Sequence, residues 1–274
     1  MANTSAKNPT SPITLATLKE MKQRREKFAC LTAYDSSFAK VSEQAGVEVL
    51  LVGDSLGMVI QGHDTTLPVS LADMIYHTQC VNRGRRRALI MVDMPFMCDA
   101  APVQALGNAA RLIKEGGAHV VKLEGGEVMA ETIHLLSERG IPVCAHLGLL
   151  PQSVHKMGGY RVQGRDDQSA DKILAAAKTL EEAGADLLLL ECVPAGLAGK
   201  IVNAVSVPVI GIGAGATCDA QVLVLYDMLG ITPGKRPKFS KDFLKDNPNV
   251  HDAIVAYVNA VKRGDFPAPE HTFS

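Results

Sequence analysis

Eight apolar runs of strand length recur along the chain, and this spacing restricts the fold more than any other feature of the sequence. The runs are nearly continuous in apolar residues, which is typical of strands that are buried on both faces. They are FACLTAYD (28–35), VLLVGD (49–54), ALIMVDMPF (88–96), HVVKLEGG (119–126), PVCAHLG (142–148), DLLLLECV (186–193), VPVIGIGA (207–214) and QVLVLYDM (221–228). Strands of this kind belong to a sheet that is covered by helices.

Amphipathic segments lie between most of these runs, and several of them stop at a glycine, a common helix end. The segment from Ser70 has Asp73 three residues later, a capping-box pattern with Asp in place of the usual Glu or Gln. We predict helices in the segments 14–25, 36–46, 70–84, 101–118, 128–141, 169–185, 195–206 and 242–264. The first of these precedes the first strand and is expected to close the bottom of a barrel.

Eight strands with intervening helices predict an α/β fold of the (β/α)8 barrel type, with an extra N-terminal helix. Only GAGATCD (213–219) separates the seventh run from the eighth, which leaves room for barely one turn. A doubly wound sheet is the structural alternative. No linker or change of composition divides the chain, so we expect residues 12–274 to form a single barrel domain after a disordered tail of residues 1–11.

Composition limits the classes of function. The 274 residues are 47% hydrophobic, enough for one large core, and the net charge of −1 gives no basic excess for nucleic acid. No apolar run reaches the roughly 18 residues of a membrane span, and the polar N-terminus lacks a secretory signal. Six cysteines occur singly, mostly in or beside apolar runs, so we expect a reducing compartment and a cytoplasmic location.

Carboxylates occur at or near the ends of the apolar runs, at Asp54, Asp93, Glu124, Glu191 and Asp227. The carboxyl ends of barrel strands meet at one mouth, where barrel enzymes build their active sites. A carboxylate there costs stability unless it is paired or bound to a metal. Oxygen donors without a Cys or His cluster suit a hard cation, so the sequence indicates a Mg²⁺ site.

Two basic side chains share this predicted mouth. Lys122 lies two residues before Glu124 and therefore on the same face of the strand, where it either pairs with a substrate carboxylate or only neutralises the acids. His146 either orients a ligand or is a satisfied core residue. The long connections 55–70 and 149–167 are candidate lids, and the alternative is that they only pack against the barrel.

Motifs along nearly the whole chain resemble those of the ketopantoate hydroxymethyltransferase family, whose members belong to the phosphoenolpyruvate/pyruvate barrel group. The motifs are LTAYDSSFAK, LVGDSLGMVIQGHDTTLPV, MVDMPF, VKLEGG, PVCAHLGLLPQSV, GGYRVQGR, LLLLECVP, PVIGIGAG and YDMLGI. The resemblance implies transfer of a hydroxymethyl group from 5,10-methylenetetrahydrofolate to 3-methyl-2-oxobutanoate through a Mg-stabilised enolate. The product would be 2-dehydropantoate, on the route to pantothenate and coenzyme A.

The same resemblance assigns roles to individual residues. Asp54 and Asp93 would bind Mg²⁺ and the substrate chelated by it, and Glu124 would complete the metal site. Ser55 and Lys122 would hold the 2-oxo acid. In a separate role, Glu191 would be the proton acceptor. The family resemblance also implies a homo-oligomer, typically a decamer, with small molecules as its other partners and with neither nucleic acid nor membrane.

Three other functions remain open at this stage. One is another Mg-dependent 2-oxo acid lyase or mutase of the same barrel group. A second is a Schiff-base aldolase with Lys122 as the nucleophile, and a third is a barrel that binds or supports without catalysis. The residues Gln61, His63 and Asp64 carry much of the family resemblance, yet they have no assigned chemical role and are expected to shape the mouth or a subunit contact.

Overall fold

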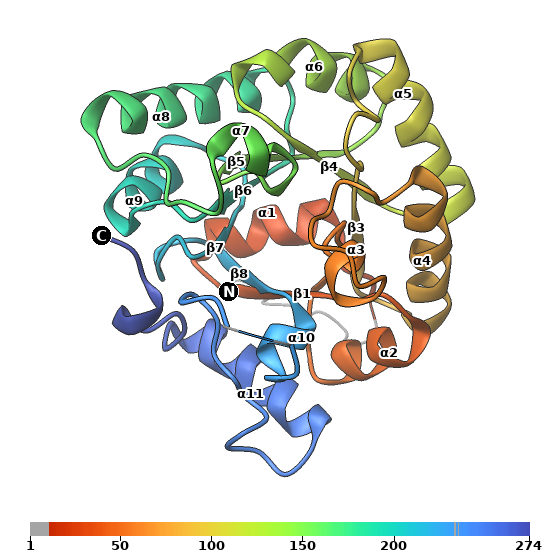
Figure 1. Cartoon of the computed structure of the whole chain (residues 1–274), viewed down its shortest axis with the longest axis vertical. Coiled ribbons are helices and arrows are strands. Elements are labelled where there is room, and N and C mark those ends of the chain that lie inside the picture. Colours follow the sequence, from red (N-terminus) through yellow and green to blue (C-terminus); the bar gives the residue numbers. More distant parts are fainter. Residues whose placement is uncertain (1–10, 233, 235) are drawn as a thin grey trace, which may run out of the picture.

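The computed structural model describes residues 11–232, 234 and 236–274, and its centre is a closed barrel of parallel strands in sequence order (Figure 1). The strands are β1 (Phe28–Thr32), β2 (Val49–Val52), β3 (Leu89–Asp93), β4 (Val120–Glu124), β5 (Val143–Gly148), β6 (Leu187–Glu191), β7 (Val209–Ile212) and β8 (Ala220–Leu223). The barrel closes because β1 pairs with β8, Phe28 opposite Ala220. The predicted barrel is therefore confirmed, and the doubly wound alternative is excluded.

Helices ring the barrel on the outside (Figure 1). They are α2 (Ser36–Gln44), α4 (Leu71–Gly84), α5 (Pro102–Arg111), α6 (Ala130–Glu138), α8 (Asp167–Glu182), α9 (Ala195–Ala204) and α11 (Val250–Arg263). A π-helical turn, η1 (Leu112–Gly116), continues α5. The predicted capping box is present at the start of α4, where Ser70 and Asp73 bond each other's backbone N–H. As the short GAGATCD segment suggested, β7 and β8 have no helix between them among the described residues.

Short helical turns lie in the connections that leave the strand ends. They are α3 (Leu56–Val59), η2 (Glu127–Met129), η3 (Pro151–Ser153), α7 (Val154–Met157), α10 (Leu225–Met228) and η4 (Pro269–His271). The prediction that Asp227 ends the eighth strand is wrong, because β8 stops at Leu223 and Asp227 lies in α10. The apolar sequence from residue 221 to 228 continues past the strand because α10 is itself packed against the core.

Two hydrophobic clusters are separated by the strand wall. Inside the barrel, alternate strand residues such as Leu89, Met91 and Val120 point inward and form the smaller cluster. Their neighbours, such as Ile90 and Val121, point outward into the larger cluster beneath the helices. Since successive strand side chains point to opposite faces, this alternation fixes which strand-end residues enter the mouth.

The N-terminal helix α1 (Leu15–Gln23) closes the bottom of the barrel, as predicted. Its Leu18 is completely buried in the interior cluster. Lys19 and Lys22 hold the helix in place by ion pairs with residues that directly precede or lie near the start of β6 and β8, Asp186 at 3.0 Å and Asp219 at 2.8 Å. The predicted disordered tail of residues 1–11 falls, apart from residue 11, outside the described residues. None of the helices among the described residues has the length and apolar character needed to cross a bilayer.

Candidate active site

The predicted strand-end acids converge at one mouth. Asp93, Glu124 and Glu191 are the last residues of β3, β4 and β6, and Asp54 lies two residues beyond the end of β2. Asp54 and Asp93 are each 3% exposed. All four carboxylates line one cavity of about 1130 Å³ that opens at this end of the barrel.

Lys122 and His146 form a buried polar layer just below the acids. Lys122 Nζ lies 3.0 Å from His146 Nδ1, 3.2 Å from Asp93 Oδ1 and 3.8 Å from Glu124 Oε1. On the other side of the ring, His146 Nε2 lies 3.3 Å from Glu191 Oε2. An ammonium group can only donate, so the Lys122 contact assigns His146 Nδ1 as an acceptor and places the ring proton on Nε2, facing Glu191. The imidazole therefore lies between the buried cation and the Glu191 carboxylate. Burial and Lys122 lower the pKa of this imidazole, but Glu124 and Glu191 outweigh them and raise it.

Asp54 is held by two hydrogen bonds from different parts of the barrel. Its backbone N–H donates to Asp93 Oδ2 at 3.0 Å, and the side-chain amide of Gln152 donates to Asp54 Oδ2 at 2.8 Å. The Gln152 backbone N–H donates to Glu124 Oε2 at 3.0 Å, and its side chain also bonds the carbonyl of Met94. One residue of η3 thus fixes two of the acids.

The crowding of charge shifts the protonation of the cluster. Burial, together with the charges of Asp93 and Glu124, raises the pKa of Asp54 well above its usual value. Burial also raises the pKa of Asp93, although Lys122 opposes this shift. For Glu124, the contribution of burial is outweighed by His146 and Lys122, and its pKa is lowered. Burial alone would lower the pKa of Lys122, but Asp93, Glu124 and Asp54 together raise it, so Lys122 is a cation.

Several polar atoms in this cluster are buried and make no hydrogen bond within the part of the chain that the structure describes. They are Asp93 Oδ1, Glu124 Oε1 and His146 Nε2. Such atoms are expensive to bury and indicate a missing ligand. The described residues contain no group of three or more His, Cys, Asp or Glu side chains that would hold a metal by themselves. The donor set nevertheless fits Mg²⁺, which uses one or two carboxylates and completes its shell with waters and substrate oxygens.

Backbone geometry at the end of β6 places Glu191 in the mouth. Cys192, the next residue, has a φ of 48°, a left-handed conformation that is uncommon outside glycine. Gly148, at the end of β5, passes so close to the Glu191 carbonyl that a Cβ there would lie 2.2 Å from the Glu191 oxygen. A side chain at residue 148 would therefore displace the strand end that carries Glu191.

The two long connections both border the cavity and touch each other. Ser55 lies beside Asp54, and its hydroxyl is 2.9 Å from the hydroxyl of the buried Tyr34. The Tyr160 hydroxyl, from the connection after β5, lies 3.7 Å from Met58 Sδ in the connection after β2. These contacts fit the predicted lids.

Within the motif that carries the family resemblance, His63 and Asp64 line the cavity, whereas Gln61 is not among its lining residues. Gln61 instead lies near Asp73, the carboxylate that caps α4.

Sequence reasoning missed Gln152 and Tyr34. Gln152 lies in a polar loop with no periodic pattern, and only the packing of η3 against β2 and β4 brings it to the acids. Tyr34 follows β1 and carries no charge that would have marked it. For both residues the useful signal would have been a position just after a predicted strand, on the same side as the acids.

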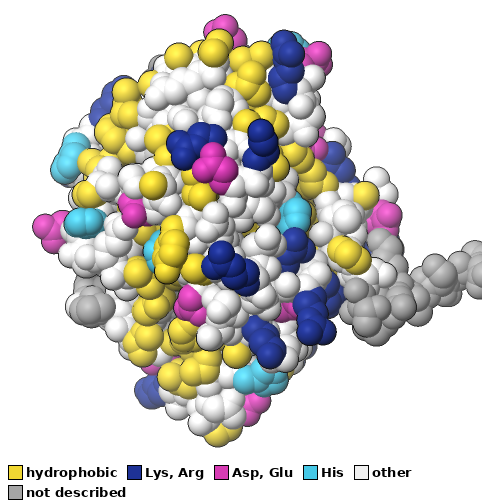
Figure 2. All heavy atoms as spheres, turned by 90° about the vertical axis from the view of Figure 1, so that its right-hand side faces the viewer, with side chains coloured by type: hydrophobic (Ala, Val, Ile, Leu, Met, Phe, Trp, Pro, Cys, Tyr) yellow, Lys and Arg dark blue, Asp and Glu magenta, His cyan; other side chains and the backbone are white. Residues whose placement is uncertain are grey.

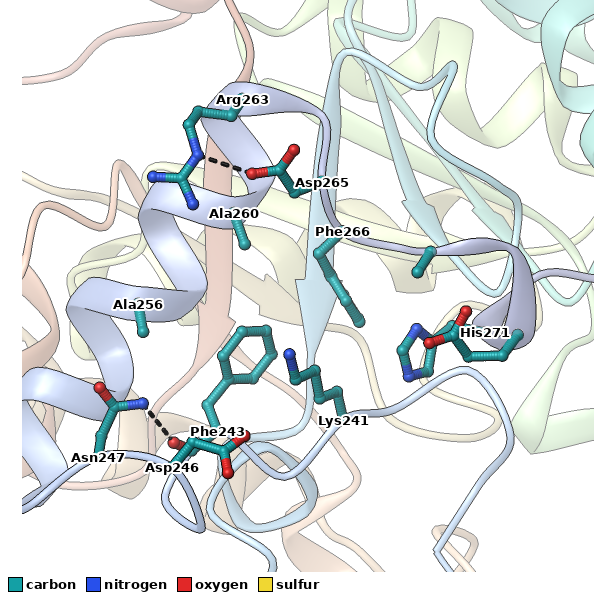
Figure 3. Close-up of a pocket in the computed structure, with 12 residues that line it drawn as sticks. Lys241, Phe243, Asp246, Asn247, Ala256, Ala260, Arg263, Asp265, Phe266 and His271 are labelled. Carbon is teal, nitrogen blue, oxygen red and sulfur yellow. Dashed lines mark hydrogen bonds and ion pairs between the residues drawn. The ribbon is translucent and has the colours of Figure 1, made fainter.

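A second, smaller cavity of about 340 Å³ lies between α11 and the segment after it (Figure 3). Arg263 pairs with Asp265 at 2.7 Å, and Asn247 bonds the carbonyl of Phe243. The remaining wall combines apolar and aromatic side chains with Lys241, Asp246, Glu270 and His271. His271 Nδ1 is buried here without a hydrogen bond among the described residues. The Asp, Glu, Lys and Arg side chains of this cavity are exposed, however, unlike Asp54, Asp93 and Lys122 of the mouth.

Comparisons with known proteins agree with this picture. A family model described as ketopantoate hydroxymethyltransferase matches residues 12–269. Proteins named 3-methyl-2-oxobutanoate hydroxymethyltransferase are similar over nearly their whole length. The one from Marinobacter nauticus is 59% identical over 95% of this chain and 98% of its own, and the one from Nitrosococcus oceani is 60% identical over 95% and 99%.

Solved structures share the fold at low identity. A 2,3-dimethylmalate lyase of the PEP mutase/isocitrate lyase superfamily superposes with a TM-score of 0.56 at 14% identity, covering 79% of this chain and 81% of that chain. Oxaloacetate acetylhydrolase in complex with 3,3-difluorooxalacetate gives 0.58 at 13% identity, covering 93% and 97%. At these identities the likeness shows a shared barrel fold.

Proposed function

The chain belongs to the ketopantoate hydroxymethyltransferase family, and we propose that it transfers a hydroxymethyl group from 5,10-methylenetetrahydrofolate to 3-methyl-2-oxobutanoate with the help of Mg²⁺. In this reaction the C3–H bond of the keto acid breaks and a bond forms between C3 and the one-carbon unit. Water supplies the hydroxyl oxygen, and tetrahydrofolate leaves. The product is 2-dehydropantoate.

One observation carries this proposal: carboxylates with unpartnered oxygens, a buried cation and a separate acid meet at a single mouth. Asp54 and Asp93 would hold Mg²⁺, with Glu124 completing the site. Bound Mg²⁺ would supply Lewis-acid stabilisation of the charge that develops on the keto acid when its proton leaves. Lys122 and Ser55 would bind the substrate carboxylate and keto group from the protein side.

Glu191 is the proposed base that takes the C3 proton. Its carboxylate lies across the mouth from the Asp54–Asp93 pair in the barrel order, and it faces the His146 Nε2–H at 3.3 Å. A hydrogen bond from His146 would hold the carboxylate in one orientation, which a proton transfer requires. The connections that carry Tyr160 and Met58 would keep bulk water from the carbanion before it attacks the one-carbon unit.

The Schiff-base alternative requires an unprotonated Lys122. The three neighbouring carboxylates raise the pKa of Lys122 and so disfavour the free amine. Borohydride treatment in the presence of the keto acid tests this alternative, because it would trap a covalent adduct only if the amine reacts. We expect no trapped adduct by mass spectrometry.

The proposed reaction is tested by following 2-dehydropantoate formation from 3-methyl-2-oxobutanoate and 5,10-methylenetetrahydrofolate. We expect product that disappears when EDTA is added and returns with excess Mg²⁺. Product formed at the full rate without folate would overturn the proposed co-substrate and favour another lyase or mutase of the barrel group. A rate insensitive to EDTA would overturn the metal assignment.

We also propose that the protein is a homo-oligomer, as the family resemblance implies. The support is the face over α4 and α5, where apolar side chains lie exposed among Lys and Arg side chains (Figure 2). Tyr76 and Val103 are 61% and 77% exposed on these helices. Sedimentation velocity measures the assembly directly, and a monomer at micromolar concentration would contradict this proposal.

A further inference from the structure

The mouth is much larger than the keto acid requires. Its volume of about 1130 Å³ exceeds the roughly 300–1,000 Å³ of pockets that bury drug-sized ligands. The acids, Lys122 and His146 account for the side formed by β2 to β6. The side formed by the residues after β7 and β8 has no role in the chemistry above. We give the name aromatic wing to five of its cavity-lining residues: Tyr226, Asp227, Lys238, Phe239 and Phe273.

The wing lies beside the end of β7, whose short connection to β8 contains no helix. Gly213, directly after β7, has a φ of 63°, and a Cβ there would lie 3.0 Å from Phe273 and 3.1 Å from Phe239. Both rings therefore pack directly against the backbone of Gly213 at the mouth. The Phe273 carbonyl accepts from Ala195 N at 3.0 Å, which ties this segment to the start of α9.

Lys238 lies over the Phe273 ring. Its Nζ donates to the Thr272 carbonyl at 2.7 Å and lies 5.1 Å from the centre of the Phe273 ring. The contact is a cation–π interaction, which orders the ring at a modest gain in energy. The wall of the wing is thus an ordered aromatic surface rather than a loose loop.

Asp227 supplies a carboxylate to this surface. It is 6% exposed, and burial raises its pKa, an effect that Thr232 and Arg236 offset only in part. The Thr232 hydroxyl lies near the Asp227 carboxylate and lowers its pKa. The hydroxyl is nevertheless buried without a well-aligned hydrogen bond to any described residue. Thr232 also lines the cavity. The wing therefore combines aromatic rings with a buried carboxylate and a buried hydroxyl on the wall of one cavity.

We propose that the aromatic wing binds the flat, nitrogen-rich ring system of the one-carbon donor, with the Asp227 carboxylate accepting hydrogen bonds from adjacent ring N–H groups. A carboxylate matches two neighbouring N–H donors in the same way as it matches a guanidinium. Phe239 and Phe273 contact the apolar faces of the ring system. This inference rests on the proposed function, because it assigns the subsite of the proposed co-substrate.

The test compares Asp227→Asn with the unmodified protein in the transferase assay. The amide keeps the shape but replaces one acceptor with a donor, so we expect the KM for 5,10-methylenetetrahydrofolate to rise about 10- to 100-fold, as for a lost charged hydrogen bond. The KM for 3-methyl-2-oxobutanoate should stay within about two-fold. Asp242→Asn is the matched control, because Asp242 lies in the same region and pairs with Arg236 but is not among the cavity-lining residues.

A second measurement separates this inference from the proposed function. Exchange of the C3 proton with deuterated water, followed by NMR without folate, reports keto acid binding and proton removal alone. If the unmodified protein neither exchanges this proton nor makes product, the proposed function fails. If it does both, and Asp227→Asn has an unchanged KM for the folate, the inference is wrong while the function stands.

Direct binding covers the case in which Asp227→Asn folds poorly. Isothermal titration of tetrahydrofolate into Phe239→Leu and Phe273→Leu tests the ring contacts with apolar volume retained. We expect each variant to bind at least about three-fold more weakly than the unmodified protein. Unchanged affinity in both variants would place the folate ring elsewhere and overturn the proposal.

Discussion

The two ends of the barrel use buried charge in opposite ways. At the bottom, Lys22 Nζ bonds both Asp219 Oδ2 at 2.8 Å and the Val202 carbonyl, and the same carboxylate oxygen accepts from Val209 N. At the mouth, Lys122 Nζ approaches Asp93 Oδ1 at 3.2 Å, yet this oxygen makes no hydrogen bond with any described residue. A charge that is fully partnered fastens the fold, whereas a charge left with unpartnered atoms is held for a ligand.

The largest effect on activity should follow from replacing Asp54 at the mouth. Asp54→Asn removes a proposed metal ligand, so kcat/KM should fall about 10⁴-fold or more, as expected for loss of several kcal/mol of metal stabilisation. Since burial and two neighbouring acids already strain this carboxylate, the metal-free variant should melt at the same or a higher temperature. Calorimetry with EDTA checks this, and a clear drop in melting temperature would make Asp54 a structural residue like Asp219.

Glu191→Gln should lower kcat by about 10²- to 10⁴-fold, the range for removal of a general base. The amide has nearly the same size and shape as the carboxylate beside His146 Nε2, so the fold and keto acid binding should be retained. Steady-state kinetics and the deuterium exchange measurement both report the change. Full activity of this variant would remove Glu191 from the assigned role.

At the bottom, the same kind of substitution should affect stability instead of turnover. Lys22→Met leaves Asp219 without its cation in a site where both side chains are 13% exposed, and should cost about 2–3 kcal/mol of unfolding free energy. The folded fraction should keep its kcat. Urea unfolding and kinetics on one preparation measure the unfolding free energy and kcat. A loss of kcat beyond about three-fold would contradict the view that charges at the bottom serve stability alone.

Gln152 tests the positioning of the mouth acids. Gln152→Met keeps similar length but removes the amide that bonds Asp54 and the Met94 carbonyl, so the Mg²⁺ concentration for half-maximal activity should rise about 10- to 100-fold. Gln79→Met, which removes a side-chain bond to a carbonyl far from the mouth, is the control. Equal metal requirements in the two variants would leave Gln152 a packing residue only.

The smallest expected effect is a pH dependence at the bottom. Burial and then Arg85 lower the pKa of His119 to about 4, against about 6.5 in an unfolded chain. The unfolded state therefore gains its proton first. Stability from this group is fully present above pH 6.5 and is lost as the pH falls towards 4, by about 1 kcal/mol because the ring is partly exposed. His119→Asn should flatten this part of the stability profile, and an unchanged profile would contradict the assignment.

The sequence predicted the barrel and the acids at its mouth because both depend on local pattern. A continuous apolar run ending in an acid, as at Glu124 and Glu191, determines both the strand and the end at which its charge emerges. Asp227 was misplaced because α10 is as apolar as a strand. Gln152 was missed since its role depends on a loop folding back over two strands, which no short-range pattern records.

Because α1 closes the bottom of the barrel, it also shields the cysteines of the barrel interior from solvent. Cys30 and Cys144 are fully buried inside the barrel, above Leu18, and burial raises the pKa of both thiols. A thiol reagent should reach them only when α1 leaves the bottom of the barrel or when the strands separate. Their rate of alkylation therefore measures how fast the barrel opens at its bottom, the end that takes no part in catalysis.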